Sequence, residues 1–192
     1  MVRFFRMSAK LVIDTSTSRT SVGLISNSKV IWSEFEDGAT AHAEAVPRLV
    51  KIALAKENDI SQVIVGMGPG PYTGLRAGIS FAQAFAWARK IELRGVCSLD
   101  AIICESPEYI SAIDARRKEI YWASYKEGKR IDGPHVTLPA EVNARVFVGE
   151  GAHKYGLVDV ATYPDVSVFP ELPNVDQPMY LRRPDAVPTS ER

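Results

Sequence analysis

The sequence predicts an α/β protein of two similar lobes, the second smaller than the first. Residues 11–31, LVIDTSTSRTSVGLISNSKVI, and residues 111–131, SAIDARRKEIYWASYKEGKRI, share an Ile-Asp pair and a similar hydrophobic pattern. VIVGMG from Val63 and VFVGEG from Val146 repeat in the same order, which indicates an internal duplication. The remaining observation is a buried strand, a glycine-rich loop and a long apolar helix, in that order, over residues 62–89.

The first lobe is expected to open with three antiparallel strands. Residues 11–14 are a short apolar run that ends in a carboxylate. The hydroxyl-rich run at 15–20 is typical of a turn, because short hydroxyl side chains bond to nearby backbone. Two more strands are expected to begin at Ser21 and Lys29, joined by a tight turn at residues 27–28.

A helix, a strand and a second helix are expected to follow. Apolar residues at helical spacing predict the first helix at about residues 43–56, with Pro47 near its first turn. The buried strand at 62–66 then leads through the glycine-rich loop into the long helix. A further strand is expected at 91–96, and a short helix from Ser98.

The second lobe is expected to repeat the three-strand opening from Tyr109 onward. No long helix follows Gly151 to match the one in the first lobe, so this lobe is smaller. We therefore expect a first lobe at 9–106, a second lobe at 107–183 and a tail at 184–192.

Composition narrows the class of protein. The 192 residues carry no net formal charge, so nothing global points to a nucleic acid, a membrane or a highly charged substrate. Cys97 and Cys104 make neither a disulfide framework nor a zinc pattern, so we expect a cytoplasmic protein. The start, MVRFFRMSAK, lacks the apolar core of a signal peptide, and Met7 is an alternative first residue. Polar residues interrupt the long apolar helix, which is not expected to span a membrane.

Two lobes that each open with a strand, a turn and a strand resemble the actin, sugar-kinase and Hsp70 superfamily, whose core is ribonuclease H-like. In such proteins a nucleotide binds between the lobes; an Asp at the end of the first strand holds a hydrated metal, and the next turns hold phosphates. The resemblance makes Asp14, Thr15 and Ser16 the nucleotide-proximal candidates, with Asp114 in the second lobe. The alternative is that these residues only satisfy their own turns, which Asp and Ser favour anyway.

The glycine-rich loop, GMGPGPYTG from Gly66, fits neither common phosphate-binding fingerprint. A P-loop needs Lys and Ser or Thr after its last glycine, whereas Leu75 and Arg76 follow Gly74. The dinucleotide pattern fails because Thr73 stands where its third glycine would be. Arg76 falls in the first turn of the predicted helix, where the helix dipole disfavours a cation. We therefore expect Arg76 to have a carboxylate or phosphate partner.

Small residues recur every four positions along this helix, at Gly74, Gly78, Ala82 and Ala86. An interior glycine costs about 1 kcal/mol relative to alanine, so Gly78 implies a compensating close contact. Two explanations stay open: this small-residue ridge packs on the protein's own first helix or sheet, or it contacts a helix of another subunit. Under the second explanation, Gly78→Leu would block association and leave the chain folded.

Six motifs spread over most of the chain, roughly Lys10 to Arg183, carry a more specific resemblance. They are LVIDTSTSRTSVGL, HAEAVPRLV, VGMGPGPYTGLRAGISFAQAFA, CSLDAI, IDARRKEIYWASY and PMYLRR. Together they resemble the bacterial TsaB (YeaZ) family of tRNA threonylcarbamoyladenosine biosynthesis, which carries a glycoprotease-like label. The glycine-rich loop continuing into TGLR is the most specific of these motifs.

The resemblance implies a partner subunit rather than an enzyme. In this family the chain binds TsaD, the catalytic paralogue, and with TsaE and ATP the complex forms N6-threonylcarbamoyladenosine at position 37 of tRNAs reading ANN codons. Helices of the first lobe make this contact and, without TsaD, a homodimer. The implied interface residues are Gly74, Gly78, Ala82 and Ala86, with Val46, Leu49, Val50 and Ala53. It also implies that tRNA is reached only through the complex, that ATP binds at the assembled complex, that no cofactor is tightly bound and that no membrane is involved.

The residues themselves also argue against catalysis. TsaD-like catalysts hold iron or zinc with a His-x-x-x-His pair, whereas here His42 is followed four positions later by Val46, which cannot ligate. No histidine stands near Cys97 or Cys104 in the sequence. We therefore expect no catalytic and no metal-binding residues. The alternative function is a small-molecule kinase or ATPase of the same superfamily; a nuclease would need clustered carboxylates that are not evident here.

Two short basic clusters, Arg116-Arg117-Lys118 and Arg182-Arg183, have two interpretations. They contact tRNA, or they form a solvated and ion-paired face. The second is the simpler interpretation, because surface charge runs usually face water.

Overall fold

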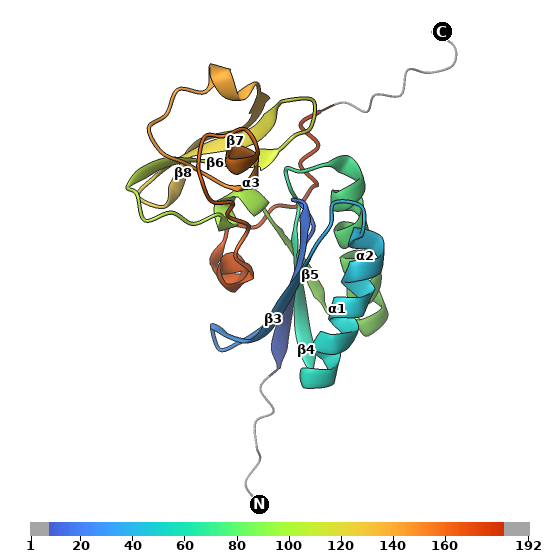
Figure 1. Ribbon diagram of the computed structural model, residues 1–192. Coiled ribbons are helices and arrows are strands. Elements are labelled where there is room, and N and C mark those ends of the chain that lie inside the picture. The colour runs from blue at the N-terminus through green and yellow to red at the C-terminus, as the bar shows by residue number, and fades with distance from the viewer. Residues whose placement is uncertain (1–7, 183–192) are drawn as a thin grey trace, which may run out of the picture.

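The computed structural model describes residues 8–182, which form two lobes, each built on its own β-sheet (Figure 1). The first sheet has five strands in the order β3-β2-β1-β4-β5. Helices α1 and α2 pack on each other and cover one face of this sheet (Figure 1). The elements are β1 Ala9–Asp14, β2 Arg19–Ser26, β3 Lys29–Asp37, α1 His42–Lys56, β4 Ile60–Gly66, α2 Tyr72–Arg89, β5 Glu92–Val96 and the 3-10 helix η1 Ser98–Ala101.

The opening β-meander forms as expected. β1 pairs antiparallel with β2, and β2 pairs antiparallel with β3. Asn27 and Ser28, which join β2 to β3, have φ of 48° and 57°. Positive φ at both central positions is the geometry of a type I′ turn, whose twist matches that of the paired strands.

Helix α1 begins at His42, close to the expected start. Its apolar stripe faces the sheet and is buried, at Ala45, Val46, Leu49, Val50 and Ala53. Pro47 lies within the helix rather than near its first turn. It faces solvent there, and the missing N–H leaves the Ala43 carbonyl without its usual partner.

The second lobe repeats the first in reduced form. Its sheet has four strands in the order β8-β7-β6-β9, so that, counted from the start of each lobe, both sheets begin 3-2-1-4. A short 3-10 helix, η2, follows its meander where the first lobe has α1, and α3 follows its fourth strand where the first lobe has α2. These elements are β6 Glu108–Asp114, β7 Ile120–Lys126, β8 Lys129–Thr137, η2 Pro139–Glu141, β9 Phe147–Val148 and α3 Glu150–Lys154. The predicted two-lobed, ribonuclease H-like α/β fold with a reduced second lobe is confirmed.

After α3 the chain returns to the first lobe. The 3-10 helix η3, Val166–Glu171, packs on the face of the first sheet that α1 and α2 leave open. Val166 and Phe169 share a buried cluster with Val12 and Ile64. The boundaries 9–106 and 107–183 stay a prediction; within the second range, η3 completes the core of the first lobe.

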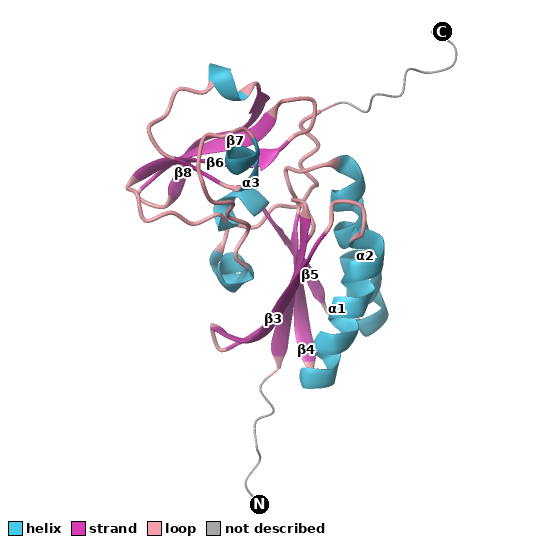
Figure 2. Cartoon of the chain, in the orientation of Figure 1, coloured by secondary structure: helices cyan, strands magenta, loops and turns pink. Residues whose placement is uncertain are grey.

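The last described segment lies as a loop along both lobes (Figure 2). The Met179 N–H donates to the Met67 carbonyl at 2.8 Å. The Arg182 guanidinium donates to the Ala115 carbonyl at 3.0 Å and also pairs with Glu119. Residues 178–182 of the PMYLRR motif therefore tie the glycine-rich loop of one lobe to the first turn of the other.

Within residues 8–182, no helix is long and apolar enough to cross a membrane. The alternative start at Met7, Arg183 of the second basic cluster and the expected tail at 184–192 lie outside the described residues.

Arg94 of β5 holds η3 on the sheet, because its guanidinium donates to the carbonyls of Phe169, Pro170 and Leu172. We predict that Arg94→Met lowers the free energy of unfolding by about 2 kcal/mol, since hydrogen bonds from charged groups contribute roughly 1.5–3 kcal/mol. Urea denaturation followed by circular dichroism measures this. Arg48→Met is the matched control, because the ion pair of Arg48 is exposed and contributes at most about 1 kcal/mol. Equal losses of stability in the two variants would contradict the role of Arg94.

Candidate functional site

The turn after β1 carries the three residues that the sequence singles out for a nucleotide. Asp14, Thr15 and Ser16 are at most 1% exposed. Asp14 Oδ1 accepts hydrogen bonds from the N–H and the hydroxyl of Ser16 at 3.0 and 2.7 Å, and Oδ2 accepts one from the Ser98 hydroxyl at 2.6 Å. Burial raises the pKa of Asp14, and the donors on Ser98 and Ser16 oppose that rise. Both carboxylate oxygens are thus bonded within the chain.

The glycine-rich loop packs directly on this turn. A Cβ at Gly66 would overlap the Asp14 carboxylate, and a Cβ at Gly70 would overlap the backbone of Ser16. Glycine is needed at both positions for close approach between two segments of the same chain. The loop therefore covers the Asp14 carboxylate, which the sequence resemblance made a nucleotide-proximal candidate.

The matching turn of the second lobe is held by ion pairs and hydrogen bonds. Asp114 Oδ2 lies 2.5 Å from Lys154 Nζ and 3.5 Å from a guanidinium nitrogen of Arg116. Its Oδ1 accepts hydrogen bonds from the Arg116 N–H and the Tyr155 hydroxyl, both at 3.0 Å. Asp114, like Asp14, is engaged by its own surroundings.

A hydrogen bond joins the two turns across the boundary between the lobes. The Ser18 hydroxyl donates to Glu150 Oε2 at 2.7 Å, and Glu150 Oε1 accepts a longer bond of 3.4 Å from the Asp114 N–H. A nucleotide that entered between the turns would have to break this bridge. The geometry favours the explanation that the turn residues satisfy their own turns.

The His42 side chain is buried and bonded within the chain. Its Nδ1 lies 2.8 Å from the Thr20 hydroxyl. Burial lowers the pKa of His42, and the positive charge of Arg116 lowers it further. Val46, four residues on, lies in the core. Across the described part of the chain, no group of three His, Cys, Asp or Glu side chains is placed to hold a metal ion.

Neither cysteine has the surroundings of a nucleophile. Cys97 is fully buried, and burial raises the pKa of its thiol to about 12. A thiol with such a pKa stays protonated at neutral pH and is unreactive. The Cys104 sulfur accepts a hydrogen bond from the Ser106 N–H at 3.4 Å.

The small-residue ridge of α2 faces inward. Gly74, Gly78, Ala82 and Ala86 are all buried within the chain. The Thr15 hydroxyl donates to the Gly74 carbonyl at 2.8 Å, and a Cβ at Gly78 would lie under 3.0 Å from the same hydroxyl. Of the two explanations for the ridge, packing on the protein's own first lobe is correct.

The α1 residues assigned to the same interface also lie in the core. Val46, Leu49, Val50 and Ala53 are at most 3% exposed and belong to the main hydrophobic cluster of the first lobe. The eight expected interface residues are thus buried within the single chain, and an interface at them stays a prediction that this burial disfavours. The outer faces of α1 and α2 are the surfaces that remain accessible.

An apolar strip runs along the outer face of α2. Trp87 is 85% exposed. The rings of Phe81 and Phe85 stack at 6.1 Å between centroids and are half-buried, while Ala84 and Ala88 are exposed. Exposed apolar patches on soluble proteins commonly mark interaction sites. We call these five residues the outer strip of α2.

A groove of about 770 Å³ opens where α1 and α2 begin. Thr40 and Ala43 line it from the α1 side, and Tyr72 and Arg76 from the α2 side. Arg116 reaches it from the second lobe. Of the described residues that line this groove, none is Asp or Glu. We call it the helix-end groove.

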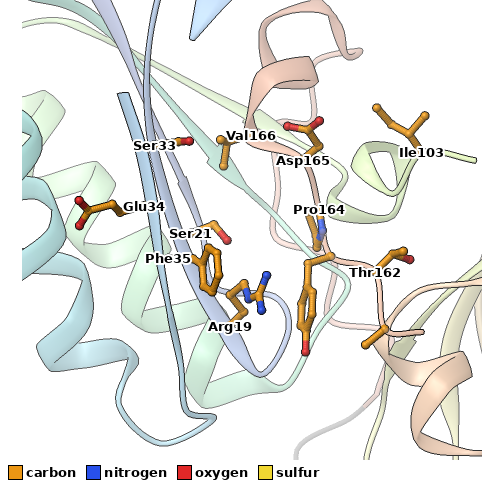
Figure 3. Close-up of a pocket in the computed structure, with 12 residues that line it drawn as sticks. Arg19, Ser21, Ser33, Glu34, Phe35, Ile103, Thr162, Pro164, Asp165 and Val166 are labelled. Atoms are coloured by element: carbon orange, nitrogen blue, oxygen red, sulfur yellow. The ribbon is translucent and has the colours of Figure 1, made fainter. Parts of the chain in front are cut away.

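A smaller hollow of about 410 Å³ lies between the β2–β3 hairpin and the returning C-terminal segment (Figure 3). Arg19 lies between the rings of Phe35 and Tyr163, 3.6 and 3.8 Å from their centroids, and pairs with Asp37 at 2.8 Å. This stack fixes the returning segment on the first lobe. Sequence reasoning missed it, because nothing local links residues so far apart in the chain.

Comparison with known proteins identifies the family. The family model described as TsaD: tRNA N6-adenosine threonylcarbamoyltransferase matches residues 36–176, which is most of the chain. The chain belongs to this family. Its relatives named TsaB confirm the expected kinship with TsaB (YeaZ).

The TsaB of Escherichia coli K12 is 32% identical over 126 residues, covering 60% of this chain and 54% of that protein. The TsaB of Bacillus subtilis 168 is 32% identical over 124 residues, with the same coverage of 60% and 54%. The chain thus matches about half the length of these curated relatives. An uncharacterized protein of Mycobacterium tuberculosis H37Rv is 36% identical over 208 residues, covering 95% of this chain and 96% of that protein.

Solved structures share the fold. YeaZ from Pseudomonas aeruginosa superimposes with a TM-score of 0.71 at 24% identity, over 86% of this chain and 90% of that one. A second Pseudomonas aeruginosa structure, of an uncharacterized protein with similarity to peptidase YEAZ, gives 0.75 at 24% identity, over 92% and 100%. The TsaB-like chain therefore has the YeaZ fold.

The inward ridge changes what Gly78→Leu should do in this TsaB-like chain. We predict a loss of more than about 3 kcal/mol in the free energy of unfolding, beyond the usual 1–3 kcal/mol of overpacking, because the contact at Gly78 is with a hydrogen-bonded turn. Ala84→Leu, on the exposed face of the same helix, should change it by less than about 0.5 kcal/mol. Urea denaturation compares the two. A Gly78→Leu variant as stable as Ala84→Leu would contradict the burial of the ridge.

The raised pKa of Asp14 predicts a pH dependence of stability. A carboxyl whose folded pKa lies above its unfolded value keeps its proton longer in the folded state. The ionisation of Asp14 therefore destabilises the folded state as pH rises from the unfolded-state pKa of about 3.9 through the folded-state pKa. We expect the unfolding free energy of the native chain, relative to Asp14→Asn, to fall with rising pH over that window. Denaturation curves of both proteins from about pH 4 to pH 8 measure this difference in unfolding free energy. A native chain that gains stability relative to Asp14→Asn as pH rises would refute the prediction.

Proposed function

We propose that this chain is a non-catalytic partner subunit in the formation of N6-threonylcarbamoyladenosine at position 37 of tRNAs that read ANN codons. It binds a TsaD-like catalytic paralogue and activates it together with a TsaE-like ATPase and ATP. Membership of the family and the relatives named TsaB support this proposal. The chain acts in the cytoplasm, where its tRNA substrates are found.

The observation that carries the proposal is the outer strip of α2. An indole that is 85% exposed is costly to leave in water, and aromatic residues of this kind dominate binding energy at protein interfaces. Phe81 and Phe85 extend the strip as a stacked pair. The strip replaces the buried ridge as the surface on which the TsaD-like partner docks. In the absence of that partner, a second copy of the chain covers the same strip as a homodimer.

The lack of independent catalysis is supported by how the interlobe turns are bonded. Asp14 and Asp114 have their carboxylate oxygens bonded to neighbouring side chains and backbone N–H groups. The glycine-rich loop covers the first of them. This argues against the alternative of a kinase or ATPase, which would need that space for nucleotide. The chain holds no tight cofactor of its own, and ATP binds at the assembled complex.

Reconstitution tests the proposal directly. The TsaD-like and TsaE-like proteins of the same organism, ATP and unmodified tRNA are combined with and without this chain, and the modified nucleoside is measured. We expect formation only when the chain is present. Full activity without it, or turnover of ATP by the chain alone at an ordinary enzymatic rate, would refute the proposal.

Trp87→Glu is predicted to weaken association with the TsaD-like partner by a factor of 30 or more, roughly 2 kcal/mol, because an interface tryptophan is a typical hot spot and a buried carboxylate adds a desolvation cost. Calorimetry or co-purification measures the weakening. Ile131→Glu is the matched control, because Ile131 is 63% exposed but lies on β8 of the second lobe. Equal binding by both variants would place the interface elsewhere.

A further inference from the structure

Arg76 has no anionic partner within the described chain. It is exposed in the first turn of α2, where the helix dipole disfavours a positive charge. Its guanidinium lies 3.4 Å from the Tyr72 hydroxyl and 5.3 Å from the centre of the same ring. Among residues 8–182, no carboxylate forms an ion pair with it. The anion that the sequence leads us to expect beside Arg76 is therefore not among the described residues.

A second arginine shares the helix-end groove with Arg76. Arg116 lies 3.5 Å from the Asp114 carboxylate, but Lys154 binds the same oxygen more closely at 2.5 Å. Of the described lining residues, the charged ones are these two arginines. The groove therefore has a positive potential although the chain as a whole is neutral. A negatively charged ligand would suit a groove lined by these two guanidinium groups.

Two exposed tyrosines stand beside the groove. Tyr72 lines it, and the Tyr180 ring lies 5.1 Å from the Tyr72 ring at an interplanar angle of 52°. Their exposed fractions are 51% and 45%. Exposed rings next to arginines are the combination with which proteins bind single-stranded nucleic acid, since bases stack on the rings and phosphates pair with the cations.

We propose that the helix-end groove binds a single-stranded segment of RNA, so that this chain itself contacts the tRNA inside the complex. The inference rests on the proposed function, which supplies tRNA as the nucleic acid. Arg76 and Arg116 hold phosphates, and Tyr72 with Tyr180 provides the stacking platform. A volume of about 770 Å³ accommodates a nucleotide with its flanking phosphates. An acidic protein segment would satisfy the arginines but would leave the aromatic platform without a role.

Fluorescence anisotropy of the full chain with a labelled single-stranded RNA of about nine nucleotides tests the groove. We expect Arg76→Gln and Arg116→Gln each to weaken binding at least fivefold and to reduce the salt slope by about 0.7 for each phosphate that is no longer neutralised. Tyr72→Ala should weaken binding at least fivefold with an unchanged salt slope. Lys51→Gln, which removes an exposed cation of α1 away from the groove, is the control and should bind as the native chain does.

Circular dichroism of each variant checks that it is folded. The two arginine variants test the groove separately, so the proposal can still be tested if one of them fails to fold. The proposal is overturned if both arginine variants bind the RNA strand as tightly as the native chain, or if a duplex of the same length binds equally well. It is also overturned if ATP displaces the strand at comparable concentration, because the groove would then be a nucleotide site. Co-purification with the TsaD-like partner separates this test from that of the proposed function. Arg76→Gln should lose RNA and keep the partner, whereas Trp87→Glu should lose the partner and keep RNA.

Discussion

The buried carboxylate of Asp14 is the point on which the rest of the structure depends. A carboxyl group taken out of water is stable only when its oxygens are hydrogen-bonded, and here the partners come from the turn after β1 and from Ser98 after β5. These bonds connect the centre of the first sheet to its far edge. They also require a neighbour without side-chain bulk, which Gly66 supplies at the end of β4. One polar cluster thus determines where the turn, the glycine-rich loop and the start of η1 lie.

Because this polar cluster is bonded within the chain, the surfaces available for binding other molecules lie elsewhere. The Asp14 carboxylate, a nucleotide-proximal candidate by sequence resemblance, is bonded within the chain. What the first lobe presents outward is the outer strip of α2 and the helix-end groove. The outer strip lies on the helical layer, and the groove lies where the starts of α1 and α2 meet Arg116 of the second lobe. This arrangement supports the proposed subunit role.

The two lobes are held together by contacts that are distant in sequence. Ser18 bonds to Glu150, Arg19 is stacked between Phe35 and Tyr163, and η3 fills the open face of the first sheet. The reduced second lobe retains the strand order of the first but has only the five-residue helix α3 where the first lobe has the eighteen-residue α2. The returning segment therefore completes the core of the first lobe and links it to the second.

The sequence by itself determined the strands and helices of the first lobe, the opening meander of the second, the duplication and the family. Apolar alternation located the strands, helical spacing located α1 and α2, and the type I′ turn at residues 27–28 required only two adjacent residues that tolerate positive φ. Tertiary structure alone decided which faces are covered. Small residues occur on more than one face of α2, so periodicity could not tell that Gly78 meets Thr15 while Trp87 meets water. Which face of α2 is buried depends on contacts between segments that are distant in the sequence, and local spacing carries no information about those contacts.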